Sequence, residues 1–102
     1  MNIPLSIVEA GKTDEYVRLQ QRLEHFNEKR AEALTKALAA ARNVYEALPH
    51  FRSSAYPMPT GQVIEINKAT AICLIANREL EKVEVILTVV ENDIKRLEEG
   101  GA

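Results

Sequence analysis

The sequence predicts an all-α protein in which two long helices fold back on each other as a hairpin, behind a short N-terminal arm. Three observations carry this prediction. A heptad repeat of apolar residues runs through 61–99, helical spacing of apolar residues runs through 13–48, and a segment rich in proline separates the two. Aromatic residues make up only 5 % of the chain and Trp is absent, which is typical of long helices rather than of sheets.

The length of 102 residues predicts one domain, residues 1–102. We divide it into an N-terminal arm at 1–12, a first helix at 13–48, a loop at 49–60 and a second helix at 61–99. Hydrophobic residues make up 46 % and charged residues 27 %, so the chain has enough apolar surface to fold. A chain of this size buries only about two-thirds of its unfolded surface, so association with a second chain is favoured.

The arm is apolar on both sides of Pro4, at Ile3, Leu5, Ile7 and Val8. It forms either a helical turn with Pro4 at its start or an extended strap, and the helical turn is favoured. The first long helix begins at Thr13, because a threonine hydroxyl can accept a free backbone N–H. Asp14 and Glu15 follow it and suit the positive end of the helix dipole.

The first helix has an apolar stripe in which Arg30 occupies one position. Its other members are Tyr16, Leu19, Leu23, Phe26, Leu34, Leu38, Ala41, Tyr45 and Leu48. A flanking row widens the stripe in the second half, at Ala33, Ala37, Ala40 and Val44. Pro49 is expected to end the helix at residue 48, because the residue before a proline is disfavoured in the helical conformation.

The second helix has the more regular pattern. With Ile66 at heptad position a, the a residues are Ile66, Cys73, Leu80, Leu87 and Ile94, and the d residues are Ala69, Ala76, Val83, Val90 and Leu97. All these seam positions are apolar, which predicts coiled-coil-like packing. Further apolar residues lie off the seam, at Ile72, Leu74, Ile75, Ile86 and Val89. One facing helix cannot cover both sets, so we expect a homodimer of hairpins that forms a four-helix bundle.

Arg30 is the polar residue most clearly directed into the apolar stripe. Folding the chain about residue 54 places it near residue 78, within reach of Glu79, Glu81 or Glu84. A single polar group in a seam penalises misaligned pairings, so we interpret this arginine as half of a register-setting ion pair. A ligand-binding arginine is the alternative.

The loop at 49–60 is longer than the two to eight residues that usually join antiparallel helices. It carries Phe51, Arg52, Tyr56 and Met58, and side chains of these kinds are enriched at protein interfaces. The four residues either form a partner-binding tip or fold back to plug the end of the bundle.

No catalytic or metal-binding signature emerges, and we predict neither an enzyme nor a cofactor. Glu-x-x-His pairs of the di-iron kind are not repeated, and Cys-x-x-Cys and His-Glu-x-x-His are absent. Glu81 and Glu84 have the spacing of a magnesium-binding pair, but Lys82 lies between them on a polar face. A metal-dependent nucleotide hydrolase is therefore the last of the alternatives.

The net charge of −2 provides no strong field to attract nucleic acid or an anionic membrane. Basic residues of the first helix are interspersed with Glu24, Glu28 and Glu32, so they form no basic stripe. The only cysteine, Cys73, lies in an apolar run, which favours a buried thiol in a reducing compartment. We expect a cytoplasmic protein without a membrane span.

Together these patterns favour a non-enzymatic protein–protein interaction module of the small chaperone, adaptor or inhibitor type. It is expected to bind itself as a homodimer, and another protein through its helix faces and the 49–60 loop. A small nucleic-acid-associated regulator and an exported helical-hairpin protein are the alternatives, although the Trp-x-Gly turn typical of one exported class is absent. The pattern does not fix the dimer orientation or the identity of the partner.

Overall fold

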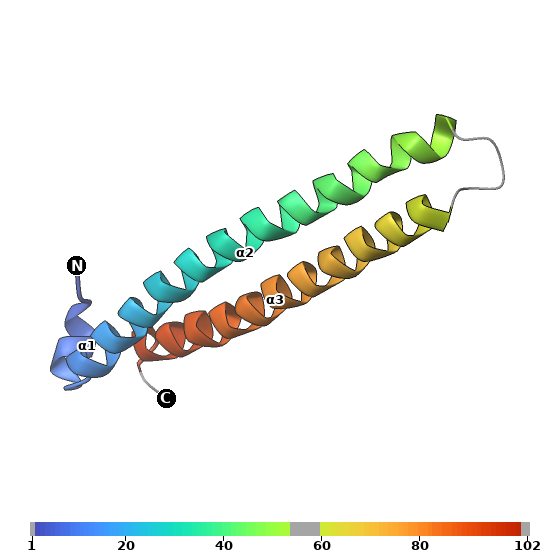
Figure 1. Cartoon of the computed structure of the whole chain (residues 1–102). Coiled ribbons are helices and arrows are strands. Elements are labelled where there is room, and N and C mark those ends of the chain that lie inside the picture. Colours follow the sequence, from blue (N-terminus) through green and yellow to red (C-terminus); the bar gives the residue numbers. More distant parts are fainter. Residues whose placement is uncertain (1, 54–59, 101–102) are drawn as a thin grey trace. The chain divides into compact units, whose positions relative to one another are not determined.

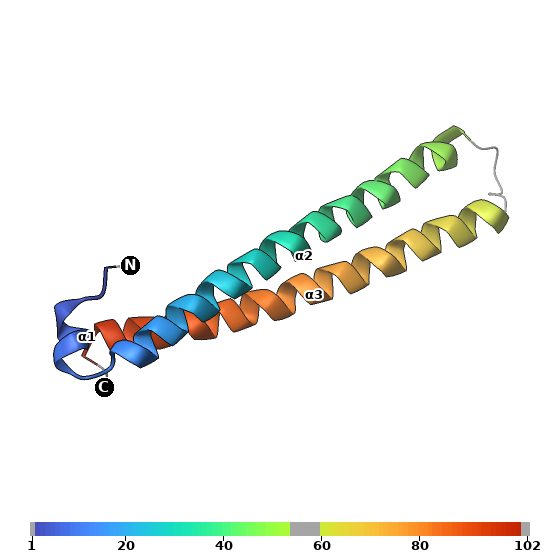
Figure 2. The same ribbon diagram turned by 60° about the vertical axis from the view of Figure 1, so that its left-hand side comes forward.

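The computed structural model describes residues 2–53 and 60–100, with side chains at 2–47 and 60–100. It contains α1 (Leu5–Glu9), α2 (Thr13–Ser53) and α3 (Thr60–Glu98), shown in Figure 1. The described residues include no strand. The two long helices run antiparallel and pack against each other, as the two views in Figures 1 and 2 show, so the prediction of an all-α hairpin is confirmed.

The chain divides into two packing units, which we describe separately. The terminal unit contains residues 1–30 and 82–102, and the central unit contains residues 31–81. Each unit therefore takes one segment from α2 and one from α3, and the terminal unit also includes α1.

The helical turn favoured for the N-terminal arm is confirmed. Pro4 precedes α1 with φ −56°, a value that its ring imposes. The chain then turns at Gly11, whose φ of 70° lies in the left-handed region that glycine adopts without strain. The N–H of Gly11 donates to the carbonyl of Val8 at 3.1 Å, and the N–H of Lys12 donates to the carbonyl of Ile7 at 3.1 Å.

The boundaries of the long helices differ from the prediction at one important point. α2 begins at Thr13 as expected but continues to Ser53, so the predicted end at residue 48 is wrong. A proline inside a helix costs about 3 kcal/mol, because it removes a hydrogen bond and crowds the preceding turn. A helix can still continue through a proline, because the fixed φ of proline is itself a helical value. α3 spans Thr60–Glu98 rather than 61–99.

The terminal unit has a core of large side chains. Ile7 of α1 is only 1 % exposed, and Val90 of α3 is 2 % exposed. The full buried cluster is Ile7, Tyr16, Val90, Ile94 and Leu97, with Ile3, Leu19, Leu23 and Ile86 packed against it. Burying each aliphatic side chain of this size contributes about 1.5–3 kcal/mol. All three helices thus contribute to one core.

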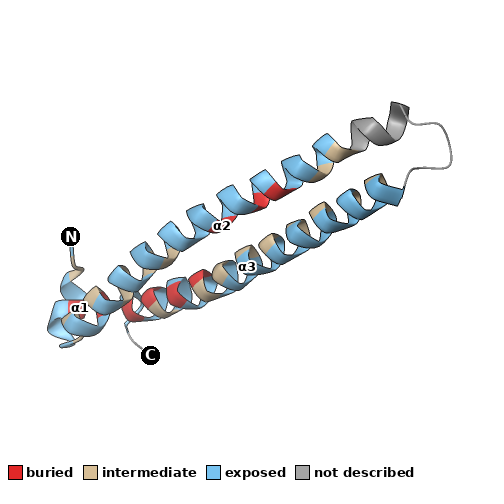
Figure 3. Ribbon diagram, viewed as in Figure 1, coloured by how far each residue is buried: buried red, intermediate tan, exposed pale blue. Residues whose placement is uncertain are grey.

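The central unit is packed differently, through small side chains. Among its described residues, the buried hydrophobic ones are Ala33, Ala37 and Ala40 (Figure 3). The facing seam of α3 is half-buried at Ile66, Ala69, Cys73, Ala76 and Leu80. Contact between alanines allows two helices to approach closely, but it removes little apolar area from water.

Every a and d residue of the predicted α3 seam, from Ile66 to Leu97, is buried or half-buried. The predicted stripe of α2 is correct up to Arg30 and wrong at Leu34, Leu38 and Tyr45, which are 40 %, 63 % and 71 % exposed; Leu48 lies outside the residues whose side chains are described. The alternation of three and four residues that starts at Tyr16 continues from Arg30 to Ala33, not to Leu34. The row first interpreted as flanking is therefore the packed one.

Candidate interaction surface

Large apolar side chains lie on the outside of the central unit, on both of its helices. On α2 they are Leu34, Leu38 and Tyr45, and on α3 they are Val63, Ile64, Ile72, Leu74 and Ile75. Scattered apolar residues are common at protein surfaces, whereas a contiguous apolar patch is typical of a site that another surface covers. The members of this group that lie on one side of the central unit are therefore the candidate interaction surface.

Part of this group forms a face on one side of the helix pair. On α2, Leu34, Leu38 and Ala41 each follow a buried alanine by one residue, and on α3, Thr70 and Leu74 follow seam residues in the same way. One residue is a turn of about 100° in the same sense on every right-handed helix. Because two antiparallel helices face each other, the same sense of rotation leads to the same side of the pair.

We call this surface the uncharged face. Its residues are Leu34, Leu38, Ala41 and Tyr45 of α2, and Val63, Asn67, Thr70, Leu74 and Asn77 of α3. All of them are exposed and none carries a charge. Glu81, which follows the seam residue Leu80 by one residue, marks the charged end of the face. A surface without charges can be covered by another apolar surface without the cost of desolvating an ion.

Two polar side chains of the uncharged face, those of Thr70 and Asn77, make contacts within their own helix. The hydroxyl of Thr70 donates to the carbonyl of Ile66 at 2.8 Å. The Nδ2 of Asn77 lies 3.8 Å from the Sγ of Cys73. The Thr70 donor is therefore already satisfied, which lowers the cost of covering it.

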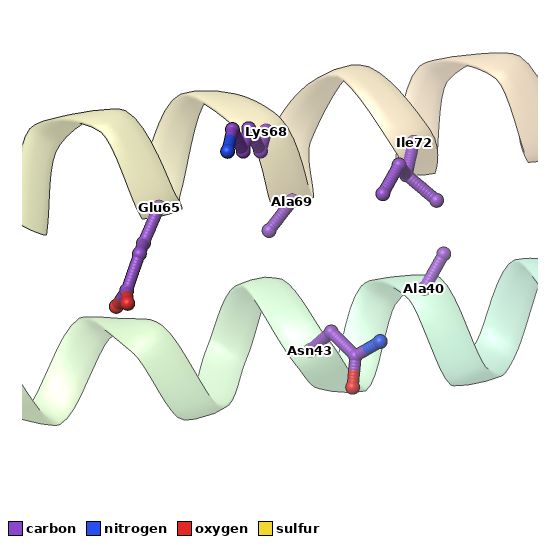
Figure 4. A pocket seen from close by; sticks show the side chains of 6 residues that line it. All are labelled: Ala40, Asn43, Glu65, Lys68, Ala69 and Ile72. Atoms are coloured by element: carbon purple, nitrogen blue, oxygen red, sulfur yellow. The ribbon is translucent and has the colours of Figure 1, made fainter.

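The opposite side of the central unit carries charges of both signs. It includes an open cavity of about 240 Å³, lined by Ala40, Asn43, Glu65, Lys68, Ala69 and Ile72 (Figure 4). In Figure 4 the side chains of Ala40 and Ala69 point into the space between the helices, and the side chain of Glu65 extends from α3 toward α2. The volume is below the roughly 300–1,000 Å³ of typical small-molecule sites, so the cavity does not indicate a ligand.

The terminal unit contains the ion pair of Arg30. Its Nε lies 3.8 Å from Oε2 of Glu84, which is one of the three predicted partners. The two side chains are 50 % and 49 % exposed, and an ion pair with this much solvent contributes at most about 1 kcal/mol. Its role in setting the register stays a prediction.

The predicted partner-binding residues fall outside the part of the chain whose side chains are described. Phe51 and Arg52 lie in the last turns of α2 as far as the backbone is concerned, and Tyr56 and Met58 lie in the segment 54–59. By contrast, the sequence pattern places Leu34, Leu38 and Tyr45 in the packed stripe of the first helix and not at the surface. Strict counting of the three-four alternation through Arg30 is the signal that identifies them.

The described residues show neither a metal centre nor a membrane span. Over 2–53 and 60–100, no three His, Cys, Asp or Glu side chains come together in a way that could hold a metal ion. In the same ranges no helix has an apolar stretch long enough to cross a bilayer.

Comparison with known proteins gives no relative from which a function could be transferred. No protein-family model matches the chain, and no curated protein or solved structure is significantly similar to it. The functional argument therefore rests on the surfaces of the chain itself.

Proposed function

We propose that this protein is a non-enzymatic protein–protein interaction module of the small chaperone, adaptor or inhibitor type. It acts as a homodimeric four-helix bundle in the cytoplasm and binds another protein through helix faces left open in the dimer and through the 49–60 segment. The observation that supports it is the inverted packing of the central unit, where alanines are inside and large apolar side chains are outside.

A second copy of the chain is the first partner in this proposal. The alanine seam of the central unit buries too little apolar area to hold two helices together by itself. The uncharged face supplies the missing area, because Leu38 and Tyr45 are 63 % and 71 % exposed. Two copies joined through this face form a bundle of four helices, in which both apolar rows of α2 are covered.

A different protein is the second partner. Ile64 and Ile75 of α3 are 48 % and 62 % exposed and do not belong to the uncharged face. They stay accessible after dimerisation, as does the mixed-charge side of the central unit. An amphipathic helix is the kind of ligand that fits such a surface, since it can place apolar anchors between charged rims.

The test of dimerisation is light scattering on a sizing column over about a hundredfold range of concentration. We expect a dimer mass for the native chain and a shift toward monomer for Leu38→Glu. The matched control is Ala39→Glu, which adds the same charge one residue away and off the uncharged face. A concentration-independent monomer with full helicity contradicts the homodimer.

The contribution of the 49–60 segment is tested by changing Phe51, Arg52 and Tyr56 together to Ala. The proposal predicts that capture of a protein from the native cytosol is lost while circular dichroism stays helical. A large fall in melting temperature with capture retained indicates instead that these side chains plug the bundle.

A further inference from the structure

We propose that the second copy docks antiparallel on the uncharged face, so that α2 of one copy packs along α2 of the other. This inference rests on the proposed homodimer and adds its orientation and its contacts. The occupant of the face is thus a second copy of this chain, and the observations that indicate it are the charge pattern and the spacing of the two rows that make up the face.

Two helix pairs that meet face to face through a twofold axis can be arranged in two ways. If the axis is parallel to the helices, the copies are parallel and α2 of one copy lies on α3 of the other. If the axis is perpendicular to the helices and lies in the plane of the interface, the copies are antiparallel and α2 lies on α2.

The composition of the two rows distinguishes these arrangements. The α2 row is Leu34, Leu38, Ala41 and Tyr45, and the α3 row is Val63, Asn67, Thr70, Leu74 and Asn77. In the parallel arrangement the apolar α2 row lies on a row that is largely polar. In the antiparallel arrangement it lies on its own copy, so the most apolar surfaces cover each other.

The spacing of the α2 row fits an antiparallel copy of itself. A twofold axis midway between Ala39 and Ala40 places Leu34 opposite Tyr45 of the second copy, and Leu38 opposite Ala41 of the second copy. A large side chain then faces a small one at the centre, which is the alternation that fills an interface between helices without voids.

Charges beside the row are also compatible with this arrangement. Arg42 flanks the row and lies 3.7 Å from Glu46 of its own helix. The same twofold axis places it opposite Ala37 of the second copy, two residues from the second Thr35 and five residues from the second Arg42. Five residues correspond to about 7.5 Å along the helix, so the two Arg42 residues are not directly opposite each other.

The orientation is measured by spin-label distances between two copies. Cys73→Ser removes the native thiol, and Glu28→Cys, Lys36→Cys and Ala39→Cys then carry a nitroxide one at a time; all three positions are exposed and lie off the uncharged face. In an antiparallel dimer the separation along the axis grows by about 3 Å for each residue of distance from the midpoint. The Glu28 pair is then about 33 Å further apart along the axis than the Ala39 pair.

Three outcomes are distinguishable. A distance that is shortest at residue 39 and longest at residue 28 supports the antiparallel dimer. Similar distances at all three positions overturn it and show a parallel dimer, in which the proposed homodimer still stands. No intermolecular coupling, with light scattering reporting a monomer, overturns both. Leu38→Glu in the same labelled chains is the control and should abolish the coupling.

Discussion

The terminal and central units use the same seam with opposite choices of side-chain size. In the terminal unit the seam holds Tyr16, Val90 and Ile94, which are 6 %, 2 % and 6 % exposed, and α1 adds Ile7. In the central unit the seam of α2 holds alanines, and its large residues stand outside. Spacing therefore decides which residues face the neighbouring helix, whereas size decides whether that contact is a sufficient core.

The two units therefore differ in how much large apolar surface they bury along one pair of helices. The terminal unit has a core of large buried side chains, and α1 packs against it as a third helix. The central unit has an exposed apolar surface, and its contact with water is energetically unfavourable. Substitutions in the two units should therefore differ in their effects on the free energy of unfolding and on the association of two copies.

The largest effect is expected from truncation in the terminal core. Ile94→Ala should lower the free energy of unfolding by about 2–5 kcal/mol, because it removes a buried side chain and leaves a cavity. Denaturant titration followed by circular dichroism measures it. The control is Val85→Ala, since Val85 is 64 % exposed in the same unit. Equal losses for both variants would mean that this core does not carry the stability.

A smaller loss is expected from enlarging the alanine seam. Ala37→Leu should destabilise the chain by about 1–3 kcal/mol, because a larger side chain forces α2 and α3 of the central unit apart. Ala39→Leu has the same change in volume and helix propensity on the exposed side, so it should stay within about 0.5 kcal/mol of the native chain. Thermal melts of the two variants test the packed row directly. Tolerance of leucine at 37 argues against an alanine contact.

The smallest effect is expected at the ion pair. Arg30→Leu should change the free energy of unfolding by about 1 kcal/mol or less, because the pair with Glu84 is half exposed. If the pair sets the register, sizing chromatography should show a broadened distribution of oligomers at unchanged helicity. Glu84→Gln should reproduce that broadening. A single sharp species in both variants removes the register role.

The sequence predicted the hairpin, the start of α2 and the whole α3 seam, because each depends on local chemistry or on a regular repeat. The prediction is wrong after Arg30, because it follows the larger residues Leu34 and Leu38 and not the strict three-four spacing, which continues through Ala33. It is also wrong at Pro49, because the energetic cost of a proline in a helix does not end α2, which continues to Ser53. The exposure of Leu38 and Tyr45 follows from the sequence only when the three-four alternation is counted strictly through Arg30, because two adjacent apolar rows otherwise satisfy the same repeat.

The alanine seam also determines how related chains can diverge. Only small side chains fit at positions 33, 37 and 40 without separating the helices, so substitutions of these alanines should be limited to glycine and serine. Leu34, Leu38 and Tyr45 should drift freely toward polar residues if water covers them, and stay large if a second chain does. An alignment of related sequences at these six positions would therefore indicate whether two copies associate, without any purified protein.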